Sequence, residues 1–504
     1  MIRRNGYVSA LIAVLLLAGC SPVGPDYVPP DEPAPKTWHT SLEGGLMDRE
    51  VDPKRLSHWW YTLQDLVLTD LIERAVSDNL DLKSARSRVR EARAKRGISR
   101  SRLFPMVDVA ASVSRNRLSE DRYGGDEYNL YAAGFDAGWE LDVFGGIRRS
   151  VEAATADLEA TREAMRDVMV SLLSEVALNY LDVRTFQAAI KVAKENLKSQ
   201  EDSHRVAVSR YEAGLTNELS VQQAAYNMEN TRSRIPVLRT SLKAAMNRLC
   251  VLLGLQPGAL NEELAGDAPI PVPPLRVAVG VPADALRRRP DIRRAERLLA
   301  ARTAEVGVAT ADLYPKFDLV GSIGLESLSL GNVFSASGLA YLIGPKARWP
   351  VFDAGAIRSN IQVQTERQQQ ALIQYESAVL TALEEVENAM IAYAEEQRRL
   401  KALEASAKAA QRAVELAQSQ YEAGLTDFTN VLDAQRSLLS FEEQLARSEG
   451  AVTSNLVRLY KALGGGWTSL LDESQGKASD GEASQKAPSK TTPPETQESP
   501  SKGD

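Results

Sequence analysis

The sequence predicts a mostly α-helical chain in which long antiparallel coiled-coil helices are combined with two β-hairpins. The first observation is a repeat at a constant separation of 210 residues, clearest where the segment Tyr211 to Thr216 returns as Tyr421 to Thr426. The second is that neither glycine nor proline occurs between Gly146 and Gly214, as an uninterrupted helix requires. A period of this length excludes a solenoid of short units, so each copy is expected to be a half that completes the other.

The composition limits the classes of protein that fit. The chain has 504 residues, 44% of them hydrophobic, so it can build a large core. Its net charge of −7 at pH 7 offers no basic surface for nucleic acid. The two cysteines, Cys20 and Cys250, lie in different contexts and do not indicate a disulfide framework.

The first nineteen residues have the pattern of a signal peptide. Two arginines precede an apolar run from Val8 to Leu17, and small residues follow. The stretch Leu-Ala-Gly-Cys that ends at Cys20 also resembles the lipobox of bacterial lipoproteins, so Cys20 is the expected lipid-attachment site. An ordinary signal peptide with a chance cysteine is the alternative. No other stretch reaches the roughly eighteen apolar residues of a spanning helix, so a segment that crosses a membrane would have to be made of strands.

The first copy of the repeat is expected over residues 69–265, after a lipidated N-terminal segment over residues 20–68. Its predicted elements are helices at about 69–101, 146–212 and 217–253 and strands at about 105–118 and 129–143. Apolar residues such as Val107 and Val109 alternate with polar residues such as Asp108 and Ser112 in the first of these strands. This period of two predicts a hairpin with one apolar and one polar face.

The second copy is expected over residues 283–467, after a Pro-rich linker at 266–282. Its predicted elements are helices at about 284–311, 356–422 and 427–463 and strands at about 315–327 and 339–352. Residues 468–504 are rich in Ser, Lys, Glu and Pro, a composition that predicts a disordered tail.

The third long helix of each copy carries apolar residues at a strict spacing of seven. This spacing indicates a left-handed coiled-coil seam. The residues are Val221, Met228, Ile235, Leu242 and Leu249 in the first copy and Val431, Leu438, Leu445, Val452 and Leu459 in the second. Pro236 interrupts the first copy alone and predicts a kink there.

The four predicted strands cannot close into a barrel by themselves, because known transmembrane barrels start at about eight strands. A barrel would therefore be shared between subunits, and a dimer, a trimer or a tetramer would each supply a multiple of four strands. The polar faces offer a lumen with Asp136 and Glu140 in one copy and Lys346 and Arg348 in the other. The edge of a soluble sandwich or an ordinary loop is the alternative interpretation of these stretches.

Six spaced motifs lie in order between about residue 17 and residue 467. They are Gly19-Cys20 with Val23 to Tyr27, Trp59-Trp60, Trp139 to Asp142 with Phe144-Gly145, Leu286 with Arg289 to Ile292 and Ala295-Glu296, Pro350 with Phe352-Asp353 and Gly355, and Leu432 to Arg436. Together they resemble the outer-membrane factor family, the TolC-like exit ducts. Within that family they resemble the lipoprotein branch that serves resistance-nodulation-division efflux pumps.

The resemblance implies an α/β-barrel channel, a homotrimer with a shared twelve-stranded barrel and a twelve-helix tunnel. Such a protein lies in the outer membrane, anchored by lipid and spanning it as a barrel, with a large periplasmic part. It would be the passive exit duct of a tripartite efflux system. The implied partners are a periplasmic adaptor (membrane fusion) protein and an inner-membrane resistance-nodulation-division transporter. A type I secretion exit duct and a periplasmic coiled-coil scaffold or adaptor without a pore are the alternatives.

The resemblance also implies a gate at the periplasmic end, an ionic and hydrogen-bonded network that includes a ring of aspartates. Asp433 corresponds to that aspartate, with Arg436 and Tyr421 as its expected partners. Three symmetry copies of Asp433 at a constriction would repel one another and concentrate cations. The alternative is that Asp433 and Arg436, three apart on a helix, form an ordinary solvated pair.

The two repeated turns are the candidate docking sites for the adaptor, because they would be the exposed tips nearest the gate. The residues are Gly214, Leu215, Thr216, Gly424, Leu425 and Thr426. Helix capping by the glycines is the alternative explanation of the repeat, and both can hold.

Catalysis is not expected. The three histidines, His39, His58 and His204, are isolated, and no HExxH, CxxC, nucleophile elbow or phosphate loop occurs. The carboxylates around Glu384, Glu385 and Glu387 are typical of a solvated helix face. No catalytic residue, metal site or cofactor is therefore predicted.

Overall fold

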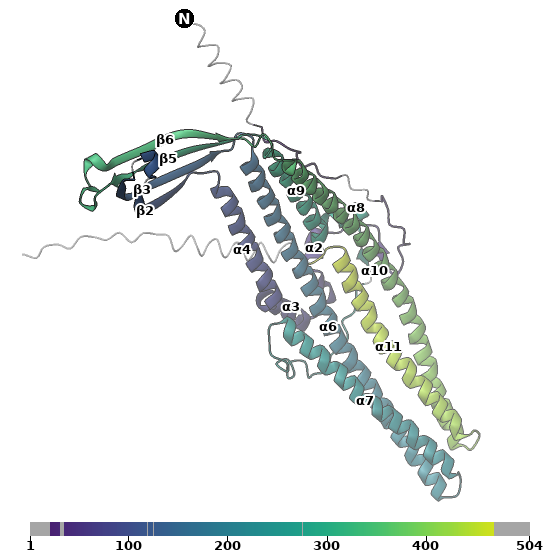
Figure 1. Cartoon of the computed structure of the whole chain (residues 1–504). Coiled ribbons are helices and arrows are strands. Elements are labelled where there is room, and N and C mark those ends of the chain that lie inside the picture. Colours follow the sequence, from purple (N-terminus) through teal and green to yellow (C-terminus); the bar gives the residue numbers. More distant parts are fainter. Residues whose placement is uncertain (1–20, 31–34, 118, 124, 275, 468–504) are drawn as a thin grey trace, which may run out of the picture.

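The computed structural model describes residues 21–30, 35–117, 119–123, 125–274 and 276–467. The predicted leader, Cys20 and the C-terminal tail lie outside these residues. Figure 1 shows an elongated molecule with a curved sheet at one end and two helical hairpins at the other. Among the described residues, no helix has a stretch long and apolar enough to cross a lipid bilayer.

The long helices occur in pairs of equal length. Each pair has one member from each copy of the repeat. The pairs are α4 (Leu80–Ser101) with α9 (Pro290–Ala311), α6 (Gly146–Glu212) with α10 (Ala356–Glu422), and α7 (Glu218–Leu252) with α11 (Phe428–Ala462). α6 and α10 run most of the length of the helical part, while α7 and α11 fold back along them from the tips (Figure 1). Pro236 lies inside α7, and the helix continues beyond it.

The four strands form one antiparallel sheet in the order β2-β3-β5-β6. The strands are β2 (Met106–Arg117), β3 (Glu127–Leu141), β5 (Lys316–Ser327) and β6 (Leu339–Arg348). β3 of the first copy pairs with β5 of the second, which joins the two hairpins. β2 and β6 are left as the edges, so within the described chain each has one strand partner.

Two expected single helices are divided in the structure. The helix expected over 69–101 is α3 (Leu66–Asp78) followed by α4, and the break falls at Asn79. The buried Asn79 caps α4 by accepting from the N–H of Leu82 at 2.8 Å, and its amide donates to the carbonyl of Leu252 at 2.9 Å. The helix expected over 284–311 is α8 (Pro282–Arg288) and α9, because Pro290 disfavours helical geometry at the residue before it.

Shorter elements surround the middle of the helices. They are β1 (Leu46–Met47), which pairs in parallel with β4 (Val277–Ala278), α2 (Pro53–Ser57) and the 3-10 turn Trp59–Leu63. The connections of the two β-hairpins contain α5 (Glu120–Tyr123), between β2 and β3, and the 3-10 turns Leu330–Asn332 and Ala336–Gly338, between β5 and β6. The largest core cluster also lies in the middle of the helices, with Trp59, Trp60 and Tyr180 fully enclosed. Burial of such large side chains is the main source of stability for the helical part.

Candidate gate and docking tips at the helical end

Both helical hairpins end in turns of the same geometry. Gly214 and Gly424 adopt positive φ angles of 68° and 74°, which favour glycine. The N–H of Leu215 donates to the carbonyl of Arg210 at 2.8 Å, and Leu425 makes the matching bond in the second turn. This Schellman geometry satisfies carbonyls at the helix end. Leu215 and Leu425 are 67% and 79% exposed, so each turn presents a leucine to the surroundings.

The two hairpins are connected near the tips by a contact between α6 and α10. The guanidinium of Arg210 lies 4.7 Å from the centre of the Tyr421 ring. The same guanidinium donates to the carbonyls of Tyr421 and Glu422 at 3.2 and 3.3 Å. One side chain therefore combines a cation–π contact with two hydrogen bonds, which makes it a tie between the hairpins.

Within the single chain, Tyr421 makes no hydrogen bond to Asp433. It is buried against Phe428, with ring centroids 5.0 Å apart, in a small core with Val431 and Leu432. Its hydroxyl has no hydrogen-bond partner among the described residues. Within the chain, Tyr421 thus links the hairpins through the packing of its ring against Phe428 and through its cation–π contact with Arg210. It does not do so through a bond to Asp433.

The structure does bring Asp433 and Arg436 together. Their carboxylate and guanidinium lie 3.0 Å apart on α11, and both side chains are substantially exposed. An exposed pair of this kind contributes about 0.3–0.5 kcal/mol, so it does not determine the fold of the tip. Because both side chains are exposed, each is free to form an ion pair with a different charged group.

Further polar contacts join the hairpins behind the tips. The amide of the buried Gln435 donates to the hydroxyl of Ser203 at 2.7 Å. Asn196 donates to Glu442 at 2.6 Å, and Arg234 bonds to Glu443 at 3.0 Å. Burial raises the pKa of Glu442, although the bond from Asn196 opposes this. These three contacts extend the link between the two hairpins along α6, α7 and α11.

Sequence analysis missed Arg210, although the repeat carried a signal for it. At the 210-residue spacing, Arg210 corresponds to Gln420, so the two copies differ where the hairpins meet. Tyr211 and Tyr421 are identical in type, yet Tyr211 is exposed and Tyr421 is buried. The difference between the copies at this position accompanies a contact that Arg210 makes.

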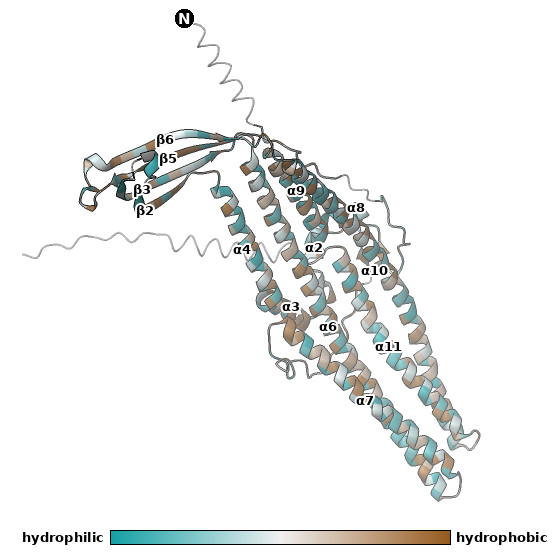
Figure 2. Ribbon diagram, in the orientation of Figure 1, coloured by the Kyte–Doolittle hydropathy of each residue, from teal (hydrophilic) through white to brown (hydrophobic). Residues whose placement is uncertain are grey.

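At the opposite end, the sheet separates apolar from polar side chains. One face carries Val109, Phe135, Ile323, Tyr341 and Ile343, all more than half exposed in the isolated chain. Figure 2 shows hydrophobic and hydrophilic residues interspersed along the strands. An exposed apolar surface of this extent requires an apolar partner.

Along the middle of the strands and at the end nearer the helices, the other face of the sheet carries charged side chains. Glu140 lies opposite Asp318, which lies opposite Lys346 on the next strand. Asp136 lies opposite Asp108, although like charges in such a pair repel. Charges of this kind are tolerated where water reaches them.

The segment that follows Cys20 is fixed at the junction of β3 and α6. Val23 donates to the carbonyl of Phe144 at 3.0 Å, and Arg149 donates to the carbonyl of Val23 at 3.1 Å. Arg149 also bonds to Asp26 at 2.6 Å. A Cβ at Gly24 would lie 2.4 Å from a backbone atom of α9, so only glycine fits this close approach. The first described residues of the chain are therefore held beside the sheet.

Comparisons with known proteins agree with this geometry. Residues 71–255 and 281–465 match the family model described as outer membrane efflux protein, once for each copy of the repeat. The chain is 32% identical to nodulation protein T of Rhizobium leguminosarum bv. trifolii, over 90% of this chain and 96% of that protein. It is also 32% identical to the solvent efflux pump outer membrane protein SrpC of Pseudomonas putida, over 91% of this chain and 98% of that one.

Solved structures show the same fold. The outer-membrane channel OprN superposes with a TM-score of 0.84 at 36% identity, covering 88% of this chain and 99% of that one. The open state of the Neisseria gonorrhoeae MtrE outer membrane channel gives 0.77 at 28% identity, covering 89% and 99%. The predicted fold class of long helices with two hairpins is thus confirmed. The chain belongs to the outer membrane efflux protein family.

Proposed function

We propose that this chain forms the outer-membrane exit duct of a tripartite efflux system, through which substrates pass passively from an inner-membrane pump to the exterior. The observation that carries the proposal is the four-stranded sheet with its two open edges and its separated faces. A bilayer requires strands to close into a barrel, because unpaired backbone groups are costly in lipid. Three copies would close the sheet with twelve strands, apolar outside and charged toward the water-filled lumen.

The helices continue each copy of this barrel away from the membrane. Asp142 accepts from the N–H groups of Ile147 and Arg148 at 2.9 Å each, which caps α6 immediately after β3. Asp353 caps α10 in the same way, with bonds from Gly355 and Ile357. In the proposed trimer, a tunnel of twelve helices would extend the lumen into the periplasm.

The lipid anchor of the proposal is Cys20. Val23, three residues later, is bonded at the junction between the sheet and α6, where a barrel would meet the periplasmic surface of the membrane. A lipid attached at Cys20 would therefore have only a short distance to reach the bilayer. The anchor would supplement the barrel rather than replace it.

The tips supply the proposed gate and docking sites. Asp433 would be repeated three times around the tunnel axis, with Arg436 beside it and the Arg210–Tyr421 tie holding the hairpins inward. Neutralising or displacing these charges would favour opening. The adaptor would dock on the exposed tips at Gly214, Leu215, Thr216, Gly424, Leu425 and Thr426.

Conductance of the purified protein in planar bilayers tests the proposal. The wild type is expected to give a mostly closed pore, and Asp433→Ala a pore that opens more readily. Glu376→Ala, which removes an exposed carboxylate of α10 remote from the tips, is the matched control and should leave the conductance unchanged. Absence of any pore-forming activity in a folded, detergent-extracted oligomer would refute the duct. A wild-type conductance in Asp433→Ala would refute the gate alone.

A further inference from the structure

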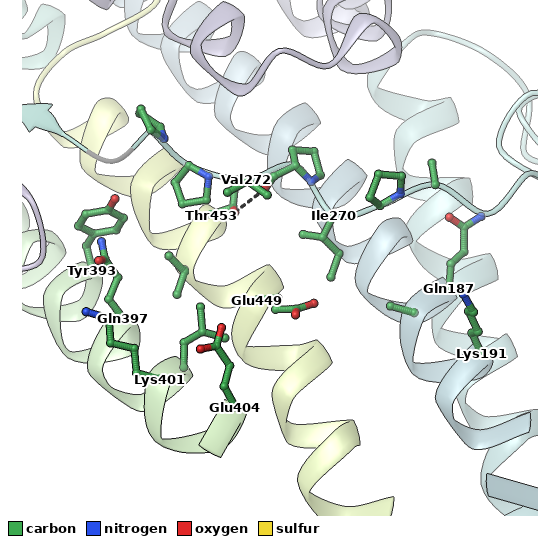
Figure 3. Close-up of a pocket in the computed structure, with 18 of the residues that line it drawn as sticks. Gln187, Lys191, Ile270, Val272, Tyr393, Gln397, Lys401, Glu404, Glu449 and Thr453 are labelled. Carbon is green, nitrogen blue, oxygen red and sulfur yellow. Dashed lines mark hydrogen bonds between the residues drawn. The ribbon is translucent and has the colours of Figure 1, made fainter. Parts of the chain in front are cut away.

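A cavity of about 800 Å³ lies between α6, α10, α11 and the linker residues 267–274. Its volume is within the range of about 300–1,000 Å³ that is typical of small-molecule sites. Figure 3 shows the linker crossing over the three helices, with side chains from all of them directed into the space below it. The cavity lies in the helical part, away from the tips and the sheet, and the proposed duct function assigns no role to it.

The walls of the cavity are largely apolar and well fixed. Ile270, Val272, Leu400 and Val452 line it together with prolines of the linker. The hydroxyl of the buried Thr453 donates to the carbonyl of Pro271 at 2.7 Å, which holds the linker against α11. The rigidity of the prolines and this bond keep the cavity open without a ligand.

Two carboxylates give the cavity a negative side. Glu404 of α10 and Glu449 of α11 both line it, and neither forms a hydrogen bond or an ion pair with another described residue. Although part of the Glu449 side chain is exposed, burial of its carboxyl group raises the pKa, and the neighbouring Glu404 raises it further. Lys191 and Lys401 also reach the wall, and Asp267 lies on the linker. In Figure 3, Glu404 and Glu449 lie on the α10–α11 side and Lys191 on the α6 side.

Neither a second copy of the chain nor the C-terminal tail suits this cavity. The exposed apolar residues Ile373, Leu380 and Ile391 of α10 are where a neighbouring chain would pack. Leu400 is nine residues after Ile391, about half a turn around the helix, so the cavity faces away from that contact. Residues 468–504 contain seven acidic and four basic residues and would be repelled by the glutamates.

We propose that this cavity binds an amphipathic organic cation, with its apolar body against Ile270, Leu400 and Val452 and its charge beside Glu404 and Glu449. The cation would supply the positive partner that the two carboxylates lack, in surroundings where a charge pair is stronger than in bulk water. The apolar walls would contribute through burial of the ligand's body. The cavity would thus be a ligand site on the helical part, bounded by α6, α10, α11 and the linker.

Equilibrium dialysis of radiolabelled tetraphenylphosphonium against the full-length protein in lipid nanodiscs tests this inference, with binding to empty nanodiscs subtracted. Saturable binding of one cation per chain is expected. The double variant Glu404→Gln/Glu449→Gln should weaken binding at least tenfold, and Ala188→Trp, which fills the cavity from α6, should abolish it. Glu376→Gln, the matched control on α10, should bind as the wild type does.

Size-matched tetraphenylborate, measured separately, distinguishes charge recognition from apolar partitioning. It should show no saturable binding, because the carboxylates repel an anion. Equal binding of both ions, or unchanged binding in the double variant, would overturn the inference. Binding that appears only after removal of residues 468–504 would assign the cavity to the tail and would also overturn it. Thermal melting of each variant verifies that it is folded, and bilayer conductance reports on the duct independently.

Discussion

The tie formed by Arg210 leads to the sharpest prediction. Arg210→Ala removes two hydrogen bonds to the carbonyls of Tyr421 and Glu422 and the cation–π contact with the Tyr421 ring. The hydrogen bonds are long, so together they contribute about 1.5 kcal/mol. The cation–π contact at this partly exposed site adds about 0.5–1 kcal/mol. The variant should therefore lose about 2 kcal/mol of coupling between the hairpins in each chain.

A loss of about 2 kcal/mol shifts an equilibrium between closed and open tips roughly thirtyfold per chain. Single-channel recording should show this as a large rise in open probability with an unchanged conductance of the open pore. Arg210→Lys should fall between wild type and alanine, because lysine keeps the charge and can donate to a carbonyl but lacks the planar guanidinium that lies over the Tyr421 ring.

The control is Arg205→Ala, which removes an arginine of α6 that pairs with Asp202 on the exposed surface. It should leave the open probability unchanged. If Arg210→Ala behaved like this control while remaining folded, the tie would be a packing feature without influence on the gate. The reasoning from the α6–α10 contact would then be refuted.

Three further predictions concern packing and protonation. Gly24→Ala should release the N-terminal segment from the close approach to α9, and limited proteolysis should then cleave it faster; an unchanged cleavage rate would contradict this. Gly450→Ala places a Cβ against the Thr185 hydroxyl and should cost about 1–3 kcal/mol, seen as a lower melting temperature that Thr185→Ala restores in the double variant. Burial, and then Asp291, raise the pKa of Asp167, so the folded state loses stability as the pH rises from the unfolded value of about 3.9 to this raised pKa. Asp167→Asn should therefore raise the melting temperature at pH 7 and have no effect below about pH 4, whereas a gain independent of pH would refute the assignment.

The sequence could predict the fold class because the decisive signals are local. The stretch between Gly146 and Gly214 lacks helix breakers, and the alternation around Val107 and Asp108 has the period of a strand. Both signals can be recognised within a short window. The division at Asn79 was missed because its cause is partly non-local, a hydrogen bond to Leu252.

The role of the charged residues could not be predicted in the same way. Glu385 and Glu387 were interpreted as part of a solvated face; Glu385 is indeed half exposed, but it also bonds to the buried Arg289 at 2.6 Å. Glu387 accepts from the backbone of His39 and Thr40, residues 348 and 347 positions away. Burial of Glu387 opposes its ionisation, yet these bonds and that of the Thr40 hydroxyl lower its pKa. Tertiary packing brings these partners together, so no regular spacing in the sequence could have predicted them.

The unequal copies at the tips have a consequence for symmetry. Arg210 has glutamine at the equivalent position, and Tyr211 is exposed where Tyr421 is buried. In the proposed trimer, the six hairpin ends around the axis would consequently alternate between two chemically distinct surfaces instead of repeating every sixty degrees. A partner that encircles them would meet two kinds of groove in turn, and its own subunits could recognise each kind by a different set of contacts.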